Sequence, residues 1–134
     1  MAIMDSSVYV AILNRGEVGH QASIDWLQRA RTSDEQIIAP NVLLAEVGAA
    51  VSRGTGDIAL ARRVLHQLKT STLIDLRPIT STLANRAAEI AIDYRIRGCD
   101  ALYVALAEQT GEPLTTLDQQ QLQRGSAIVT TTTP

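Results

Sequence analysis

Two acidic residues directly follow predicted strands in this 134-residue chain. Asp5 comes after the short apolar segment at 2–4, and Asp118 comes after "PLTTL" at 113–117. Ligands of open α/β sheets bind beyond the carboxyl ends of the strands. If both segments belong to one parallel sheet, both carboxylates lie at its ligand-binding edge.

Two further acids lie on the apolar faces of predicted helices. In "CDALYVALA", Asp100 is followed at three, four and seven positions by Tyr, Val and Ala, so all four side chains share one helical face. Glu46 likewise falls within the apolar arc of a helix predicted at 41–54. An acid in such a place is often an edge residue or a cap, and Asp100 taken alone fits a helix N-cap equally well.

The four acids taken together indicate a bound cation. Burying an isolated carboxylate costs several kcal/mol unless the group is paired or binds a metal. Apart from Arg97 near Asp100, no Lys or Arg lies within five residues of these acids on the same helical face or an adjacent strand position. Oxygen ligands without His or Cys favour Mg²⁺, or alternatively Mn²⁺, over zinc. We therefore expect Asp5, Glu46, Asp100 and Asp118 to line one metal site.

The elements that would position these acids are short strands alternating with helices. Strands are predicted at 2–4, 36–40, 73–79 and 127–131, and a strand followed by a turn is predicted at 112–118. Helices are predicted at 6–14, 20–31, 41–54, 57–69, 81–97 and 99–107, with a short polar helix or loop at 119–124. This order predicts an α/β three-layer sandwich, in which helices flank a short central parallel sheet. Without a repeat or a low-complexity linker, a single domain over 1–134 is expected.

Local signals also predict where the helices begin and end. A serine is expected to cap the helix at 6–14, and Asn41 and Asp57 are expected to cap the third and fourth helices. Gly54 and Gly98 are expected to end the helices that precede them. The polar tail "TTTTP" at 130–134 is expected to fray.

The composition is that of an ordinary globular protein, with 46% hydrophobic and 19% charged residues. Phe is absent, so Leu, Ile, Val and Ala must build the core. A net charge of −2 gives no overall attraction to nucleic acid or to an anionic membrane. The single cysteine, Cys99, excludes an intrachain disulfide and a cysteine zinc cage. Because no basic leader and no apolar run of about 20 residues is found, we expect a soluble, cytoplasmic protein.

Three segments resemble the motifs of the PIN domain, and specifically of the VapC-type toxins of bacterial type II toxin–antitoxin pairs. They are "IMDSSVYVAIL", "APNVLLAEVGAAVSRG" and "CDALYVALAEQTGEPLTTLD", and they occur in the expected order over nearly the whole chain. The resemblance implies a Mg²⁺-dependent endoribonuclease with an acidic centre at the carboxyl end of a parallel sheet. It also implies an RNA substrate, a small VapB-like antitoxin whose C-terminal segment fills the groove, and a homodimer formed through the helices at 41–53 and 57–69.

The resemblance also implies roles for individual residues. The catalytic and metal-binding acids would be Asp5, Glu46, Asp100 and Asp118. Ser7 and Thr116 match hydroxyl positions that orient the acids, although both also fit ordinary cap or strand residues. Many relatives carry a further acid or an Arg-Phe pair after the fourth acid, where this chain has "QQQLQ". The choice between one and two bound ions therefore stays open.

Two other classes of protein share features of this pattern. An aspartyl phosphatase needs a second Asp two residues after the first, where Ser7 stands, and a receiver domain needs a strand-end lysine, whereas Lys69 lies on a predicted helix. A PIN-fold binding module without catalysis is the alternative that stays open. The presence of all four acids argues against it, and a comparison of RNA cleavage in Mg²⁺ and in EDTA would decide.

Overall fold

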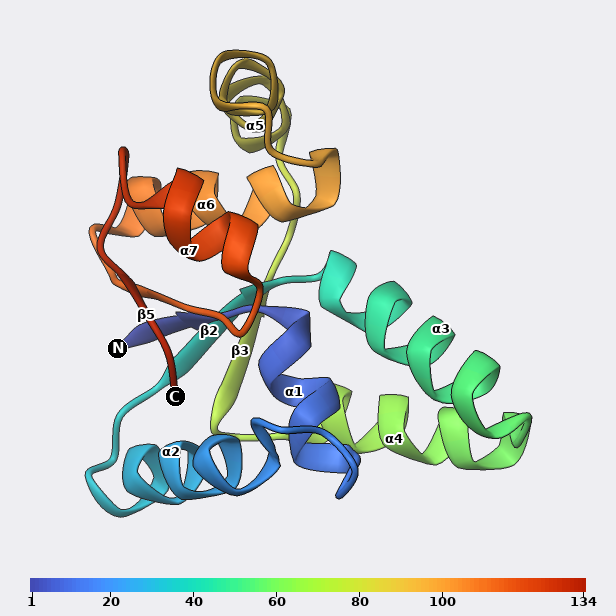
Figure 1. Cartoon of the computed structure of the whole chain (residues 1–134). Coiled ribbons are helices and arrows are strands. Elements are labelled where there is room, and N and C mark those ends of the chain that lie inside the picture. The colour runs from blue at the N-terminus through green and yellow to red at the C-terminus, as the bar shows by residue number, and fades with distance from the viewer.

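The computed structural model describes all residues, 1–134, as a parallel sheet with helices on both faces (Figure 1). The strands are β1 (Ala2–Met4), β2 (Ile37–Pro40), β3 (Ile74–Arg77), β4 (Leu114–Thr115) and β5 (Thr131–Thr132). The helices are α1 (Ser6–Leu13), α2 (His20–Thr32), α3 (Val42–Thr55), α4 (Ile58–Thr70), α5 (Ser81–Tyr94), α6 (Gly98–Thr110) and α7 (Gln119–Gly125). The predicted three-layer α/β sandwich is confirmed.

The strand order β3-β2-β1-β4-β5 places the first strand at the centre of the sheet. Ile3 of β1 pairs with Ile38 of β2 on one side and with Leu114 of β4 on the other. The chain adds β2 and β3 in one direction and then returns past β1 to add β4 and β5, so the winding direction reverses between β1 and β4. Connections that leave two such strands diverge and leave a crevice at their carboxyl ends. Asp5 and Asp118 follow these two strands.

Helices cover both faces of the sheet, as a wholly parallel sheet requires. In Figure 1, α6 and α7 lie on one face and α1 and α2 on the other, while α3 and α4 form a hairpin that extends to one side. Helix α6 contacts β1, β2 and β4 directly. Its residues from Tyr103 to Ala107 are all buried, which explains why its sequence is apolar nearly all round.

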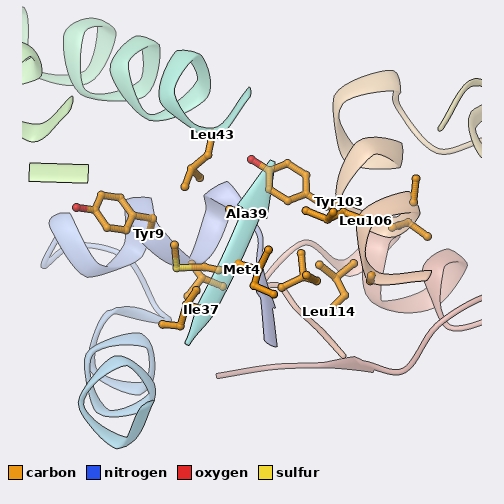
Figure 2. Close-up of a cluster of buried hydrophobic side chains, with 14 of the residues drawn as sticks. Met4, Tyr9, Ile37, Ala39, Leu43, Tyr103, Leu106 and Leu114 are labelled. Atoms are coloured by element: carbon orange, nitrogen blue, oxygen red, sulfur yellow. The ribbon is translucent and has the colours of Figure 1, made fainter. Parts of the chain in front are cut away.

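The core is mainly aliphatic, as the absence of Phe predicted, and two tyrosines supply its aromatic rings (Figure 2). Ile3, Met4 and Tyr103 are fully buried. No helix combines the length and the apolar character that crossing a membrane would require.

Helix caps agree with the predictions in part. Asp57 caps α4, where its carboxylate accepts a hydrogen bond from the Leu60 N–H at 2.9 Å. Asn41 precedes α3, but its side chain makes no capping hydrogen bond because its backbone is already helical. Helix α3 also runs past Gly54 and ends at Gly56, which adopts the left-handed conformation with φ of 69°. The second glycine is the one at which the chain reverses into α4.

Two predictions near the C-terminal half were wrong. The long helix α5 ends at Tyr94, and Arg95 closes it in the left-handed conformation, so Gly98 begins α6 instead of ending α5. The last strand, β5, lies at Thr131–Thr132 within the segment expected to fray, whereas the apolar residues at 127–129 precede it. Pairing with β4 fixes this two-residue edge strand, and Ile128 and Val129 pack against the core instead.

Candidate active site

A groove of about 840 Å³ opens at the carboxyl edge of the sheet, beside the point where the winding direction reverses. Residues of α1, α3, α6 and α7 line it together with the residues that follow β1 and β4. All four predicted acids line this one groove: Asp5, Glu46, Asp100 and Asp118. The structure therefore brings together four side chains that lie far apart in the sequence, while their chemical roles stay a prediction.

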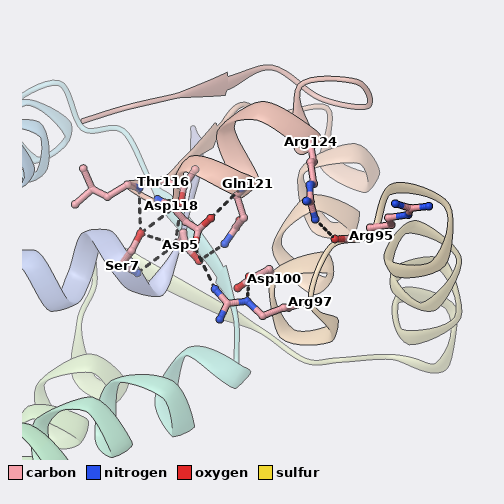
Figure 3. A network of polar contacts seen from close by, with 10 residues as sticks. Asp5, Ser7, Arg95, Arg97, Asp100, Thr116, Asp118, Gln121 and Arg124 are labelled. Carbon is pink, nitrogen blue, oxygen red and sulfur yellow. Dashed lines mark hydrogen bonds and ion pairs between the residues drawn. The ribbon is translucent and has the colours of Figure 1, made fainter.

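Asp5 is the most buried of these acids, with 2% of its surface exposed. It caps α1, so the predicted serine cap was wrong. Its Oδ2 accepts hydrogen bonds from the Ser7 N–H at 3.2 Å, from the Ser7 hydroxyl at 2.5 Å and from the Thr116 hydroxyl at 2.9 Å (Figure 3). Asp5 takes the cap position because its backbone is extended, whereas both serines already lie within the helix.

The hydroxyls of Ser7 and Thr116 join the two strand ends at the groove. The Ser7 hydroxyl accepts a hydrogen bond from the Leu117 N–H at 3.0 Å, and the Thr116 hydroxyl accepts one from the Asp118 N–H at 3.0 Å. Each hydroxyl also donates to Asp5, so each links the turn after β1 to the turn after β4. The two residues thus hold Asp5 in place.

Gln121 belongs to this site and was missed by the sequence analysis. It lies on α7, is 1% exposed, and donates from Nε2 to Asp5 Oδ1 at 3.0 Å (Figure 3). Asp118 caps α7 and accepts the Gln121 backbone N–H at 3.0 Å. The spacing of Asp118 and Gln121 is that of a capping box, but the Gln121 side chain binds Asp5 and the Asp118 N–H binds Thr116, so no local signal in the sequence identified this contact.

Glu46 enters the groove from α3, where it is half-buried. The hydroxyl of Tyr103, which lies on α6, donates to Glu46 Oε1 at 2.6 Å. Burial raises the pKa of Glu46, the bond from Tyr103 opposes this shift, and repulsion from Asp5 and Asp100 adds to it. Burial, and then the bond to Glu46, also raises the pKa of Tyr103. Tyr103 lies on an apolar helical face, so the sequence did not indicate its hydrogen bond to Glu46.

Asp100 lies in the first turn of α6 and is not its N-cap, because Arg97 takes the cap position. The Nε of Arg97 lies 3.2 Å from Asp100 Oδ2, and its Nη2 lies 3.2 Å from Asp118 Oδ2 (Figure 3). Asp118 therefore has a basic partner, which the search for a Lys or Arg within five residues did not reach. Arg97 precedes Asp118 by 21 residues, so only the tertiary fold brings the two together.

The groove carries more negative than positive charge. Five carboxylates and two guanidinium groups line it: Asp5, Glu17, Glu46, Asp100 and Asp118, with Arg53 and Arg97. Burial raises the pKa of Asp100, Asp5 adds to the shift, Arg97 opposes it, and Asp118 adds a smaller contribution. Burial is thus the main cause of the raised pKa of Asp100, the neighbouring acids add repulsion, and Arg97 opposes it.

The acids of the groove are the right kind of ligand for a hard divalent cation, but in this structure they lie too far apart to bind one together. All four acids offer oxygen ligands, which suit Mg²⁺ or Mn²⁺. No three acidic, His or Cys side chains, however, lie close enough together in this arrangement to hold one ion. The guanidinium of Arg97 bridges Asp100 and Asp118. A cation shared by these acids would therefore require Arg97 to withdraw and the carboxylates to move inward.

The sheet order, the groove at the reversal point and the acids around it define an α/β protein with an acidic site at the carboxyl edge of a parallel sheet. The model of the PIN domain family matches residues 2–126. The chain therefore belongs to the PIN domain family. No curated protein sequence matches it.

Several solved structures share this fold. The VapC20 toxin of Mycobacterium tuberculosis, which cleaves the sarcin–ricin loop, is 20% identical, with a TM-score of 0.76 over 95% of each chain. FitAcB from Neisseria gonorrhoeae is 18% identical, with a TM-score of 0.74 over 98% of this chain and 96% of that one. VapBC2 from Rickettsia felis, bound to a fragment of promoter DNA, is 13% identical, with a TM-score of 0.72 over 99% and 98% of the two chains. At these identities the likeness establishes the fold.

Proposed function

We propose that this protein is a Mg²⁺-dependent endoribonuclease that acts as the VapC-type toxin of a type II toxin–antitoxin pair. The observation that carries the proposal is the convergence of four acids on one groove at the reversal point of the sheet. Membership of the PIN domain family and the likeness to an RNA-cleaving toxin support the same activity. We expect the protein to act in the cytoplasm.

The residues of the groove have distinct parts in this proposal. Asp5 and Asp100 would hold the principal ion, while Glu46 and Asp118 would complete its shell through water or hold a second ion. The bound cation would polarise a phosphodiester group and lower the pKa of a bound water. It would also reduce the repulsion between the acidic groove and an RNA backbone. Ser7 would keep Asp5 in position, together with Thr116.

A small VapB-like antitoxin would occupy the groove with an arginine. The ion pairs of Arg97 support this, because they demonstrate that a guanidinium fits between Asp100 and Asp118. Similar folds occur in a toxin–antitoxin complex from Klebsiella pneumoniae and in VapBC2. A homodimer would form through the α3–α4 hairpin, on which Ile58 is exposed.

The test is RNA cleavage by the parent protein and by Asp5→Asn, in Mg²⁺ and in EDTA. Asparagine keeps the shape of the side chain but removes its charge, so we expect a loss of at least about 100-fold, the upper end of the range for residues that support metal sites. Asp25→Asn is a matched control, because Asp25 is exposed on α2 away from the groove. Mg²⁺-dependent cleavage by Asp5→Asn at the parent rate would refute the role of Asp5. A parent protein that cuts RNA in neither condition would favour the PIN-fold binding module.

A further inference from the structure

Three exposed arginines lie beside the acidic groove, where α5 connects to α6. Arg97 lines the groove, and Arg95 precedes it by two residues, a stretch of chain that reaches at most about 7 Å. Arg124, which lies on α7, donates from its guanidinium to the backbone carbonyl of Arg95 (Figure 3). The fold therefore brings arginines from two distant parts of the chain together at the rim of a site lined by carboxylates.

Two of these arginines are largely free to bind a ligand. Neither Arg95 nor Arg124 forms an ion pair. The contact of Arg124 with the last carbonyl of α5 stabilises that helix end, as a cation commonly does there. A guanidinium group has five N–H donors, so this contact leaves most of the donors of Arg124 without a partner.

The backbone of Arg95 is unusual for an arginine. It closes α5 in the left-handed conformation with φ of 55°, where glycine or asparagine is the usual residue. The side chain of Arg95 is exposed and forms no ion pair that would offset this strain. Contacts within the chain therefore do not explain why an arginine stands here, whereas a bound anion would.

The anion that fits this rim is the backbone of RNA. Arginine binds phosphate through two parallel N–H donors, which makes it the preferred residue for phosphate recognition. The net charge of −2 gives the protein no overall attraction to a polyanion, so the binding of RNA has to depend on a local positive patch. A strand with one phosphodiester in the groove would place its neighbouring phosphates outside the acids, at the rim.

We infer that Arg95 and Arg124 bind the phosphates that flank the scissile group of the RNA substrate. This inference rests on the proposed function and adds to it a surface that holds the strand without any cation. It predicts that the protein binds RNA in EDTA, and that this binding depends on these two arginines more than on arginines elsewhere on the molecule.

The test is the binding of a labelled single-stranded RNA to the full chain in EDTA, followed by fluorescence anisotropy from about 50 to 200 mM salt. Each phosphate contact contributes about 0.7 to the slope of log K against log salt for a single strand. A variant with both Arg95→Gln and Arg124→Gln loses two contacts, so its slope should be shallower by about 1.4. Its loss of affinity over this fourfold range of salt should be about 7-fold smaller than that of the parent.

A matched control removes two arginines from the opposite edge of the sheet. Arg29 and Arg31 are exposed near the end of α2. Arg29 lines a pocket with Ala2 and Ile37, the first residues of β1 and β2, so it lies at the amino edge of the sheet. Arg29→Gln with Arg31→Gln changes the net charge by the same amount, and we expect this variant to keep the slope of the parent.

The outcomes separate the inference from the proposed function. If the rim variant binds RNA like the α2 variant, the inference fails, the ribonuclease proposal stands, and the rim is left to an acidic protein partner. If the parent binds no RNA in EDTA, the inference also fails. If the rim variant alone has the shallower slope but the parent cuts no RNA in Mg²⁺, the RNA surface stands and the proposed activity fails.

A single variant guards against a structural effect of Arg124. Loss of its contact with the Arg95 carbonyl could loosen the end of α5, which thermal unfolding would reveal. Arg95→Gln alone keeps that contact and removes a side chain that forms no ion pair, so it should unfold like the parent. Its slope should be shallower by about 0.7, and an unchanged slope would overturn the role of Arg95.

Discussion

Replacement of Arg97 by glutamine is expected to tighten the binding of Mg²⁺ or Mn²⁺ to the groove. Arg97 is bound 3.2 Å from a carboxylate oxygen of Asp100 and 3.2 Å from one of Asp118. A cation that binds these two carboxylates must first break both ion pairs. The free energy of the two pairs is therefore subtracted from the free energy of cation binding in the parent protein.

The exposure of the three side chains sets the size of this effect. Arg97 is 74% exposed, and the side chains of Asp100 and Asp118 are 14% and 24% exposed, so solvent screens both pairs. Pairs of this kind contribute roughly 0.2–1 kcal/mol each, which gives about 0.4–2 kcal/mol for the two. Since about 1.4 kcal/mol corresponds to a factor of ten, the affinity should rise about 2- to 30-fold.

Calorimetric titration with Mn²⁺ at low ionic strength would measure this change. Arg53→Gln is the control, because Arg53 lines the same groove and its loss removes the same charge, but it is not paired with an acid. The difference between the two variants isolates the ion pairs from the general field of the groove. If Arg97→Gln binds Mn²⁺ no more tightly than Arg53→Gln does, Arg97 does not compete with the cation and the reasoning is refuted.

Three further predictions concern stability. Tyr103→Phe removes the donor to Glu46 and should lower the free energy of unfolding at pH 7 by about 1–3 kcal/mol in urea denaturation, and an unchanged value would contradict the role of that bond. Glu46→Gln should stabilise the metal-free protein at neutral pH. Because the pKa of Glu46 is raised in the folded state, the folded protein binds more protons than the unfolded chain above pH 4.5, so the stability of the parent falls as the pH rises through the raised value. The advantage of Glu46→Gln in denaturation should therefore grow from pH 4 to pH 7, and a constant advantage would contradict the shift. Asp57→Ala should cost about 0.5–2 kcal/mol through loss of the α4 cap, measured as a lower midpoint of thermal unfolding.

The acids of the site were predictable where the signal was local. Asp5 and Asp118 each follow a strand, and parallel strands all end at the same edge of the sheet. Glu46 and Asp100 were predictable because each interrupts an apolar helical face. The ion pair between Arg97 and Asp118 was not predictable, because it depends on how α6 and α7 pack and leaves no spacing in the sequence.

In the fold, too, the features with a local signal were predictable and those set by tertiary packing were not. The order of strands and helices follows from their hydrophobic patterns, and the cap at Asp57 follows from its side chain. Helix α3 could end at either of two glycines that lie close together, Gly54 and Gly56. Only the path of the chain into α4 selects the second. Strand β5 has no apolar pattern of its own, since its two threonines are held by pairing with β4.

The hydrogen bonds around Asp5 would also limit which ions the proposed cation site can select. Three donors already bind Oδ2, so this carboxylate can contact an ion through one oxygen but cannot bind it in a bidentate manner. Ca²⁺ commonly takes about six to eight oxygens, with some carboxylates bidentate, whereas Mg²⁺ is satisfied by about six single contacts at shorter distance. In the proposed cation site, a side chain fixed in this way would favour the smaller ion, so we expect calcium to be a poor substitute for magnesium.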